Sequence, residues 1–310
     1  MMTAIFATIL NMSLTASYCI AAVVLLRFFL KKQPKLLSYL LWSVVLFRLL
    51  FPVSFSSSFS LLPMGTDLIP RGNPVEQSTQ GNAWEQNLHV ETTGKPEVEA
   101  GGIKASQGED KAQHTVSRTQ ILLSIGAWIW FVGTFLFIAY GALSAYHLKR
   151  FLRKAVCVED NIYEAENLPS PFVFGIIRPR IYLPAGLTAI ERGYVVEHER
   201  VHAARKDYLV KILAWIARCI HWFNPLVWFS FALLENDMEM SCDEAVIRRL
   251  GMEAKENYSR ALLSLSCDKM GVGGCPPAFG EGRVKDRVRN VLTYRKRAAA
   301  VVAVIGVVLI

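Results

Sequence analysis

Long apolar runs are the feature of this sequence that most restricts its fold. Thr3–Leu30, Leu36–Phe51 and Thr119–Ala145 are all strongly apolar, and the third contains no charged residue. A helix needs about 20 apolar residues to cross a bilayer. A fourth run, Ala298–Ile310, extends only about 20 Å as a helix, so we expect it to be the start of a fourth membrane helix that the sequence cuts short. These runs predict a mainly α membrane protein with a transmembrane helix bundle.

Clusters of basic residues give this bundle an orientation. They occur at 31–35, 149–154 and 295–297, and short cytoplasmic loops carry such an excess of Lys and Arg. All three clusters are cytoplasmic if the N-terminus lies outside the cell. Membrane topology then accounts for the net charge of +8. We therefore expect membrane lipid as a partner and no direct contact with nucleic acid. Arg48, inside the second run, either snorkels to the outer interface or faces the interior of the bundle.

This topology divides the sequence into five segments. Residues 64–118 are acidic overall and rich in Gly, Ser and Gln, a composition typical of flexible chain, so they are predicted to form a flexible extracellular loop. The other segments are two transmembrane helices with a short cytoplasmic loop (1–63), a third transmembrane helix (119–146), a cytoplasmic domain (147–297) and the start of a fourth transmembrane helix (298–310).

The cytoplasmic segment has an α+β pattern. The predicted elements, in order, are strands 169–175 and 176–184 and helices 188–204, 207–222, 225–250 and 281–296. Thr188 and Glu191 form a capping-box pattern at the first of these helices. The Asn224-Pro225 break divides the apolar stretch 212–234 into halves of about 16 Å. We therefore expect a helical hairpin here that does not cross the membrane.

An HExxH motif at 198–202 carries the chemical prediction. On a helix, His198 and His202 lie on one face, so both imidazoles can bind one ion. Catalytic zinc sites use such a pair and keep a position open for water. Glu199 lies beside that position and is the predicted general base, which later returns the proton to the leaving amine. A solvated helix with two ordinary histidines is the alternative for this motif alone.

A third ligand is expected on the helix that follows the hairpin. Glu239 and Asp243 form an ExxxD pattern and lie one turn apart. Glu239 is the predicted zinc ligand, and Asp243 is predicted to accept a hydrogen bond from a ligand histidine. Glu235 is the competing ligand, and Cys242 has the weaker partner pattern. Glu197 and Asp207 are interpreted as surface or supporting groups, and His221 as a packed histidine of the core.

Several motifs together resemble the BlaR/MecR-type antirepressor membrane metallopeptidases. The resemblance covers most of the sequence outside the external loop. The motifs are PFVFGIIRPRIYLP at 171–184, HExxH at 198–202, Asp207-Tyr208, HWFNP at 221–225, ExxCDE at 239–244, and AFGE at 278–281 followed by 283–297. In combination they are far more specific than HExxH alone.

The resemblance implies a gluzincin-like cytoplasmic domain with one zinc ion. It also implies an external C-terminal sensor that responds to a β-lactam or another signal. The protease is then expected to cleave a cytoplasmic substrate, a winged-helix transcriptional repressor, and also itself. No part of the sequence is assigned to that sensor, so the inducing signal stays open.

Three further expectations and two alternatives complete the prediction. The strand Ile181, Tyr182 and Leu183 is expected to pair with an extended substrate. The Gly- and Pro-rich loop 270–280 is the predicted self-cleavage region, near Ala278 and Phe279. A homodimer is also expected. The alternatives are a housekeeping membrane metalloprotease and a catalytically silent membrane sensor.

Overall fold

The computed structural model describes residues 1–52, 109–267 and 277–295. It divides into two compact units, Met1–Ala7 with Phe55–Trp128 and Thr8–Ser54 with Ile129–Ile310, and each is considered by itself. The described part of the first unit consists of the N-terminal ends of two long helices. The second unit contains a four-stranded sheet and most of the helices, and it holds the candidate site.

Two described helices are long and apolar enough to cross a membrane: α1 (Met2–Phe29) and Gln120–Leu152 within α3 (Glu109–Leu152). A short 3-10 turn, Leu30–Lys32, leads from α1 to α2 (Lys35–Leu50). α2 coincides with the predicted second run, but its 16 residues extend only about 24 Å. α3 begins at Glu109, inside the predicted flexible loop. The predicted fourth membrane helix, 298–310, lies outside the described residues.

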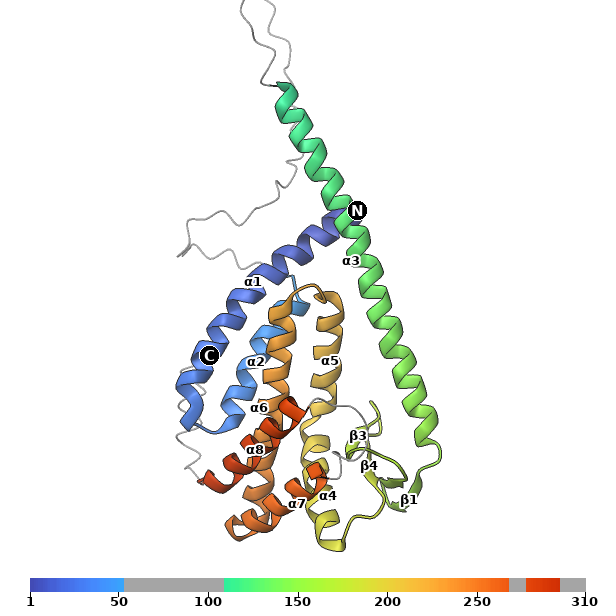
Figure 1. Ribbon diagram of the computed structural model, residues 1–310, viewed down its shortest axis with the longest axis vertical. Helices are drawn as coiled ribbons and strands as arrows, with labels where there is room; N and C mark the ends of the chain where they lie inside the picture. Colours follow the sequence, from blue (N-terminus) through green and yellow to red (C-terminus); the bar gives the residue numbers. More distant parts are fainter. Residues whose placement is uncertain (53–108, 268–276, 296–310) are drawn as a thin grey trace, which may run out of the picture. The chain divides into compact units, whose positions relative to one another are not determined.

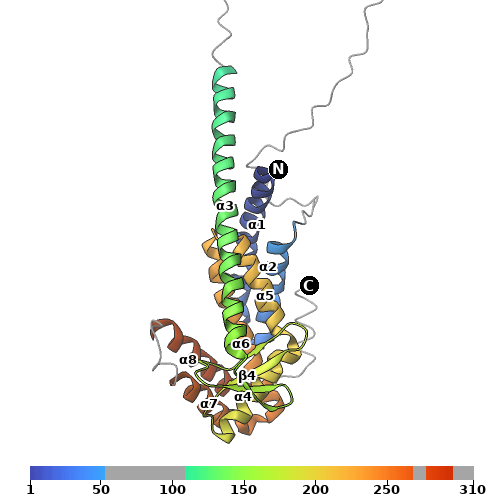
Figure 2. The ribbon, with the colours of Figure 1, turned by 90° about the vertical axis from the view of Figure 1, so that its right-hand side faces the viewer.

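An apolar cluster in the second unit packs α1 and α2 against α5 (Asp207–Ile220) and α6 (Pro225–Leu250). Figures 1 and 2 show α2, α5 and α6 side by side. The buried members are Ala16, Ile20, Val23, Trp42, Val45, Leu46, Leu49, Ala214, Ala217, Val227, Phe231 and Leu234. The predicted Asn-Pro break is confirmed, because the Asn224 side chain accepts a hydrogen bond from Leu226 N at 2.9 Å and caps α6. Its amide donates to Ser13 and Ser17 of α1.

Glycines of α3 lie against tryptophans near the end of α5. A Cβ atom at Gly133 or Gly141 would overlap the indole of Trp222 or Trp215, respectively. The Trp130 indole also donates a hydrogen bond to the carbonyl of Ile220 at 2.8 Å. Small residues at helix interfaces allow such close approach where lipid offers no hydrophobic driving force.

The sheet contains four short strands in the order β1-β2-β4-β3. The strands are β1 (Val156–Glu159), β2 (Ile162–Ala165), β3 (Phe172–Phe174) and β4 (Arg180–Pro184). β2 and β4 are parallel, whereas the β1/β2 and β3/β4 pairs are antiparallel. The two predicted strands are present but shorter, because Gly175 at φ +118° begins a turn that continues to Pro179. The β1–β2 hairpin was not predicted.

Four helices pack together: α6, α4 (Ala189–Arg205), α7 (Lys255–Cys267) and α8 (Pro277–Thr293). α4 also contacts β3 and β4, and it begins with the predicted capping box of Thr188 and Glu191. α7 was not predicted, and α8 begins earlier than expected. These helices share an apolar cluster with α6, made by Val201, Cys242, Val246, Ile247, Tyr258, Leu262 and Val291.

The predicted self-cleavage residues are therefore not in a loop. Ala278 and Phe279 lie in the first turn of α8, because this helix begins at Pro277, and Pro is well suited to the first helical position. The remainder of the predicted loop up to residue 276 lies outside the described residues.

A buried ion pair joins α1 to α6. Arg27 donates from Nε and Nη2 to the two carboxylate oxygens of Asp237 at 2.6 and 2.8 Å. The Trp42 indole of α2 donates to the same carboxylate at 2.9 Å. The Asp237 side chain is fully buried, so its charge depends on these donors.

We expect Arg27→Ala to lower the free energy of unfolding by about 3–5 kcal/mol, because it leaves the Asp237 carboxylate buried without its cation. Thermal and denaturant unfolding of the protein in detergent measures this loss. Arg260→Ala is the matched control. It removes a solvent-exposed ion pair with Glu256 and should cost only about 0.3–0.5 kcal/mol. Equal effects of the two substitutions would contradict a structural role for the buried pair.

Candidate functional site

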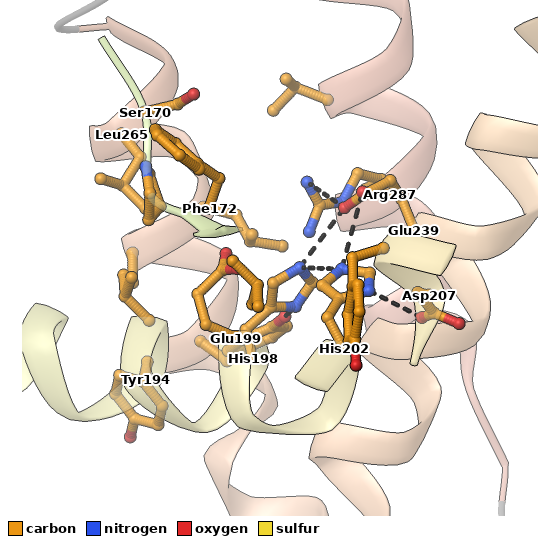
Figure 3. Close-up of a pocket in the computed structure, with 18 of the residues that line it drawn as sticks. Ser170, Phe172, Tyr194, His198, Glu199, His202, Asp207, Glu239, Leu265 and Arg287 are labelled. Atoms are coloured by element: carbon orange, nitrogen blue, oxygen red, sulfur yellow. Dashed lines mark hydrogen bonds and ion pairs between the residues drawn. The ribbon is translucent and has the colours of Figure 1, made fainter. Parts of the chain in front are cut away.

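A cavity of about 380 Å³ lies between the sheet and the helices of the second unit. Residues of β3, α4, α5, α6, α7 and α8 line it. Figure 3 shows His198, Glu199 and His202 of α4 with Glu239 of α6 and Arg287 of α8. Segments that are far apart in the sequence therefore meet in one polar site.

The two histidines of the motif share one face of α4 and point toward each other. Their Nε2 atoms lie 3.1 Å apart, and both residues are buried. The i, i+4 spacing on a helix produces this arrangement without help from the rest of the fold. Without a metal ion, a hydrogen bond of this length forms when one ring donates from Nε2 and the other accepts.

Glu239 approaches both histidines from α6. Its Oε2 atom lies 3.3 Å from His198 Nε2, and its Oε1 atom lies 3.6 Å from His202 Nε2. Two ligands at 2.0–2.1 Å from a tetrahedral zinc ion are about 3.3 Å apart. The two Nε2 atoms and the Glu239 carboxylate therefore fit one such ion. The structure brings together the three residues that the sequence nominated as metal ligands.

Cys242 offers a different third ligand. Nitrogen atoms of His198 and His202 and the sulfur of Cys242 all lie within 4.8 Å of one another. The Cys242 side chain is fully buried, however, and its sulfur lies 3.6 Å from Nδ1 of His198, on the side away from Glu239. Glu239 is among the residues that line the cavity, and Cys242 is not. Water and substrate in the cavity therefore reach the Glu239 side of the histidine pair.

Each histidine ring has a hydrogen-bond partner on its other nitrogen. Asp207 Oδ2 lies 2.7 Å from His202 Nδ1, and Tyr258 Oη lies 2.8 Å from His198 Nδ1. Tyr258 donates its proton to Asp243 Oδ1 at 2.6 Å, so its oxygen accepts from His198. Partners of this kind fix the tautomer in which Nε2 is free to bind a metal.

The sequence assigned the contact with a ligand histidine to Asp243. Asp243 Oδ1 is 3.4 Å from His198 Nδ1, and the shorter contact of this nitrogen is with Tyr258. Asp207 was interpreted as a surface or supporting group, and its side chain is only 1% exposed. The sequence signal that could have identified Asp207 as a histidine partner was its position directly after the HExxH helix. Tyr258 was missed because α7 itself was not predicted.

Arg287 was also missed, although it connects two of the predicted residues. It donates from Nε and Nη2 to the Asp243 carboxylate at 2.8 and 2.7 Å. Its Nη1 atom lies 3.4 Å from Glu239 Oε2. α8 thus contributes a cation to the site, whose acidic residues lie on α4, at the start of α5 and on α6.

These charges shift the ionisation of the site. Burial alone would raise the pKa of Glu239, but Arg287 and the two histidines hold this pKa well below its usual range. Burial opposes the protonation of His198, yet Cys242 and Glu239 beside it raise its pKa to about 10. The pKa of His202 is also raised, against the effect of burial, chiefly by Asp207. The metal-free site is a cluster in which a carboxylate pairs with a protonated histidine pair.

Glu199 is buried at the cavity wall, next to the first histidine of the pair in the sequence. A carboxylate there can accept a proton from a water molecule bound near the Nε2 atoms. Lys211 of α5 also lines the cavity, and its Nζ atom lies 3.5 Å from Glu239 Oε1. The site therefore holds a candidate base and two cations.

The predicted substrate strand does not fit this sheet. Ile181, Tyr182 and Leu183 are buried in β4, whose backbone is already paired with β2 on one side and β3 on the other. In the described sheet, β3 forms the edge nearest the site, because Phe172 and Val173 line the cavity. A peptide can add to the open edge of β3, whereas β4 has no free edge.

Comparison with known proteins relates most of this chain to one peptidase family. A model of the family described as BlaR1 peptidase M56 matches residues 7–291. The regulatory protein BlaR1 of Bacillus licheniformis is 36% identical over 105 residues, which cover 33% of this chain and 18% of that protein. The methicillin resistance mecR1 proteins of Staphylococcus aureus and Staphylococcus epidermidis are 27% identical over 138 residues, which cover 42% of this chain and 24% of theirs.

The matched segments thus span less than a quarter of the length of these relatives. The family match, in contrast, includes almost the whole chain from α1 to α8 and every residue of the candidate site. The chain belongs to the BlaR1-type M56 peptidase family.

Proposed function

We propose that this chain is a membrane-bound zinc endopeptidase that acts in signal transduction. His198, His202 and Glu239 hold the ion in this proposal, and Glu199 is the general base. The observation that carries it is the convergence of three donor groups, with contacts of 3.1–3.6 Å between them, beside Glu199 in a cavity. Zinc in such a site polarises the scissile carbonyl and lowers the pKa of a bound water.

Each of these residues then has a separate role in peptide hydrolysis. Glu199 takes the proton of the attacking water and delivers it to the leaving amine. Asp207 and Tyr258 keep the histidine rings in the orientation that presents Nε2. Arg287 keeps Glu239 ionised, as the lowered pKa of this carboxyl indicates.

An extended peptide is the proposed substrate, bound along the open edge of β3. This strand lies beside α4, and the cavity is lined by Phe172, Val173, Leu262 and Leu265 in addition to the polar residues. Main-chain hydrogen bonds to β3 would hold the peptide independently of its sequence, and these apolar side chains would select residues near the scissile bond.

The regulatory role rests on the relatives' names, regulatory protein and methicillin resistance protein. We infer that the peptidase domain is cytoplasmic, with the N-terminus outside, because the basic clusters follow the positive-inside rule. Its proposed substrates are a cytoplasmic transcriptional repressor and the chain itself at Ala278–Phe279. Cleavage at this bond requires the first turn of α8 to unwind, because a protease binds extended backbone.

We expect Glu199→Gln to retain about one zinc ion per chain and to lose about 10²–10⁴-fold in cleavage rate, because the base is removed and the ligands are not. Metal content and cleavage of a co-expressed repressor measure the two effects, and N-terminal sequencing identifies any fragment that begins at Phe279. Glu197→Gln is the control on the same helix, since Glu197 pairs with Arg249 at the surface. Cleavage at the wild-type rate by Glu199→Gln protein would contradict the mechanism.

The two candidate third ligands give opposite predictions. Glu239→Gln should weaken zinc binding by at least about 100-fold, because an amide oxygen replaces a charged ligand. Cys242→Ala should not weaken zinc binding, because the thiol lies on the Nδ1 side of His198 and its loss removes a cause of the raised His198 pKa. Chelator competition with purified protein decides between them, and the reverse ranking would assign the ligand to Cys242.

Zinc affinity should rise about tenfold per pH unit between pH 6 and 8. The raised pKa of His198, about 10, keeps one proton on the histidine pair throughout this range, and zinc must displace it. Higher pH removes that proton, so the sign of the effect is tighter binding at higher pH. Calorimetry in buffers of different ionisation enthalpy should detect release of about one proton. An affinity that levels off near pH 7 would contradict the raised pKa.

A further inference from the structure

The carboxylate that holds His202 also receives a hydrogen bond from α2. Tyr39 donates from its hydroxyl to Asp207 Oδ1 at 2.9 Å, while Asp207 Oδ2 contacts His202 Nδ1 at 2.7 Å. Figure 3 shows the second of these contacts. Each oxygen of one buried carboxylate therefore has its own partner, and rotation of the carboxylate would break both contacts.

Arg205 closes the same group of residues. Its Nε atom lies 3.5 Å from Asp207 Oδ2, and its guanidinium lies over the Tyr39 ring at 4.9 Å from the centroid. Arg205 also donates from Nη1 to the Ser241 hydroxyl of α6 at 3.1 Å. The tyrosine is thus fixed at both its ring and its hydroxyl, and α2, the end of α4 and α6 meet at this point.

α2 also contacts the helix that carries Glu239. The Trp42 indole donates to Asp237 at 2.9 Å, and the backbone N–H of Lys35 donates to Glu244 Oε2 at 3.0 Å. Asp237 and Glu244 lie before and after Glu239 on α6. One helix therefore contacts the histidine side of the site through Tyr39 and the glutamate side through Trp42 and Lys35.

We propose that Tyr39 is a positioning residue of the metal site: it orients Asp207, which in turn orients the ring of His202. The inference rests on the proposed function, because it takes His202 as a metal ligand. It goes beyond that function by assigning a role in the metal site to a residue of α2, which belongs to the membrane-helix part of the chain.

Tyr39→Phe removes one hydroxyl and keeps the ring that stacks on Arg205. We expect this variant to bind Zn²⁺ about 3–10-fold more weakly than the wild type, which is less than the 10–100-fold typical of a direct partner of a ligand. Competition with a chromophoric chelator in detergent measures the affinity. Ser43→Ala is the matched control, because it removes an exposed hydroxyl from the same helix and should leave the affinity unchanged.

Thermal unfolding of the metal-free proteins separates positioning from stability. A merely structural role predicts a lower midpoint for Tyr39→Phe and an unchanged zinc affinity once the protein is folded. Positioning predicts weaker binding even at temperatures where both metal-free proteins are fully folded. The ligand-field spectrum of bound Co²⁺ should also shift in Tyr39→Phe and not in Ser43→Ala, because the geometry of the His202 ring changes.

A double-mutant cycle tests the path through Asp207. Asp207→Asn alone should weaken binding about 10–100-fold, and Tyr39→Phe should have no further effect in that background, because its partner is gone. Additive effects would overturn the proposed path. If the wild type binds zinc and Tyr39→Phe binds it with the same affinity, this inference alone is overturned. If the wild type binds no zinc, the proposed function is overturned as well.

Discussion

The spacing between α4 and α6 is the constraint on which the candidate site depends. α4 supplies both histidines and α6 supplies Glu239, and the donor atoms must stay within about 3.6 Å of one another. No direct bond between the two backbones sets this distance. Buried polar contacts do so instead: Arg205 of α4 donates to Ser241 of α6, and Tyr258 of α7 contacts His198 of α4 and donates to Asp243 of α6, whose charge is balanced by Arg287. Such pairs are costly when one partner is lost, so they hold one arrangement in preference to others.

The local part of the site could be predicted from the sequence, and the long-range part only through a motif. His198 and His202 share a face because of helical periodicity, which needs no tertiary information. Glu239 was found because ExxxD places two carboxylates on one face of a helix, although nothing in the sequence shows which side of α6 meets α4. Family resemblance supplied the remaining motifs, and the match over residues 7–291 confirms that resemblance.

The errors share a physical cause. Tyr258 and Arg287 act across more than 40 residues of sequence, and neither stands in a pattern with spacing of its own. Ile181–Leu183 was expected to pair with a substrate, but β4 is paired with β3 and with β2, and β2 was not predicted. Ala278 and Phe279 follow a Gly- and Pro-rich segment that resembles a loop, yet Pro277 begins a helix.

α1, α2 and the candidate site form one structure. Asp237, Asp207 and Glu244 are buried, and each accepts at least one hydrogen bond from residues 27–42, namely from Arg27, Trp42, Tyr39 or the Lys35 amide. A fragment limited to residues 147–297 would keep the carboxylates and lose these donors, and an unpaired buried charge costs several kcal/mol. The peptidase region therefore depends on α1 and α2 for its own charge balance. A displacement of either helix changes the surroundings of the candidate metal ligands directly, through groups that are already in contact.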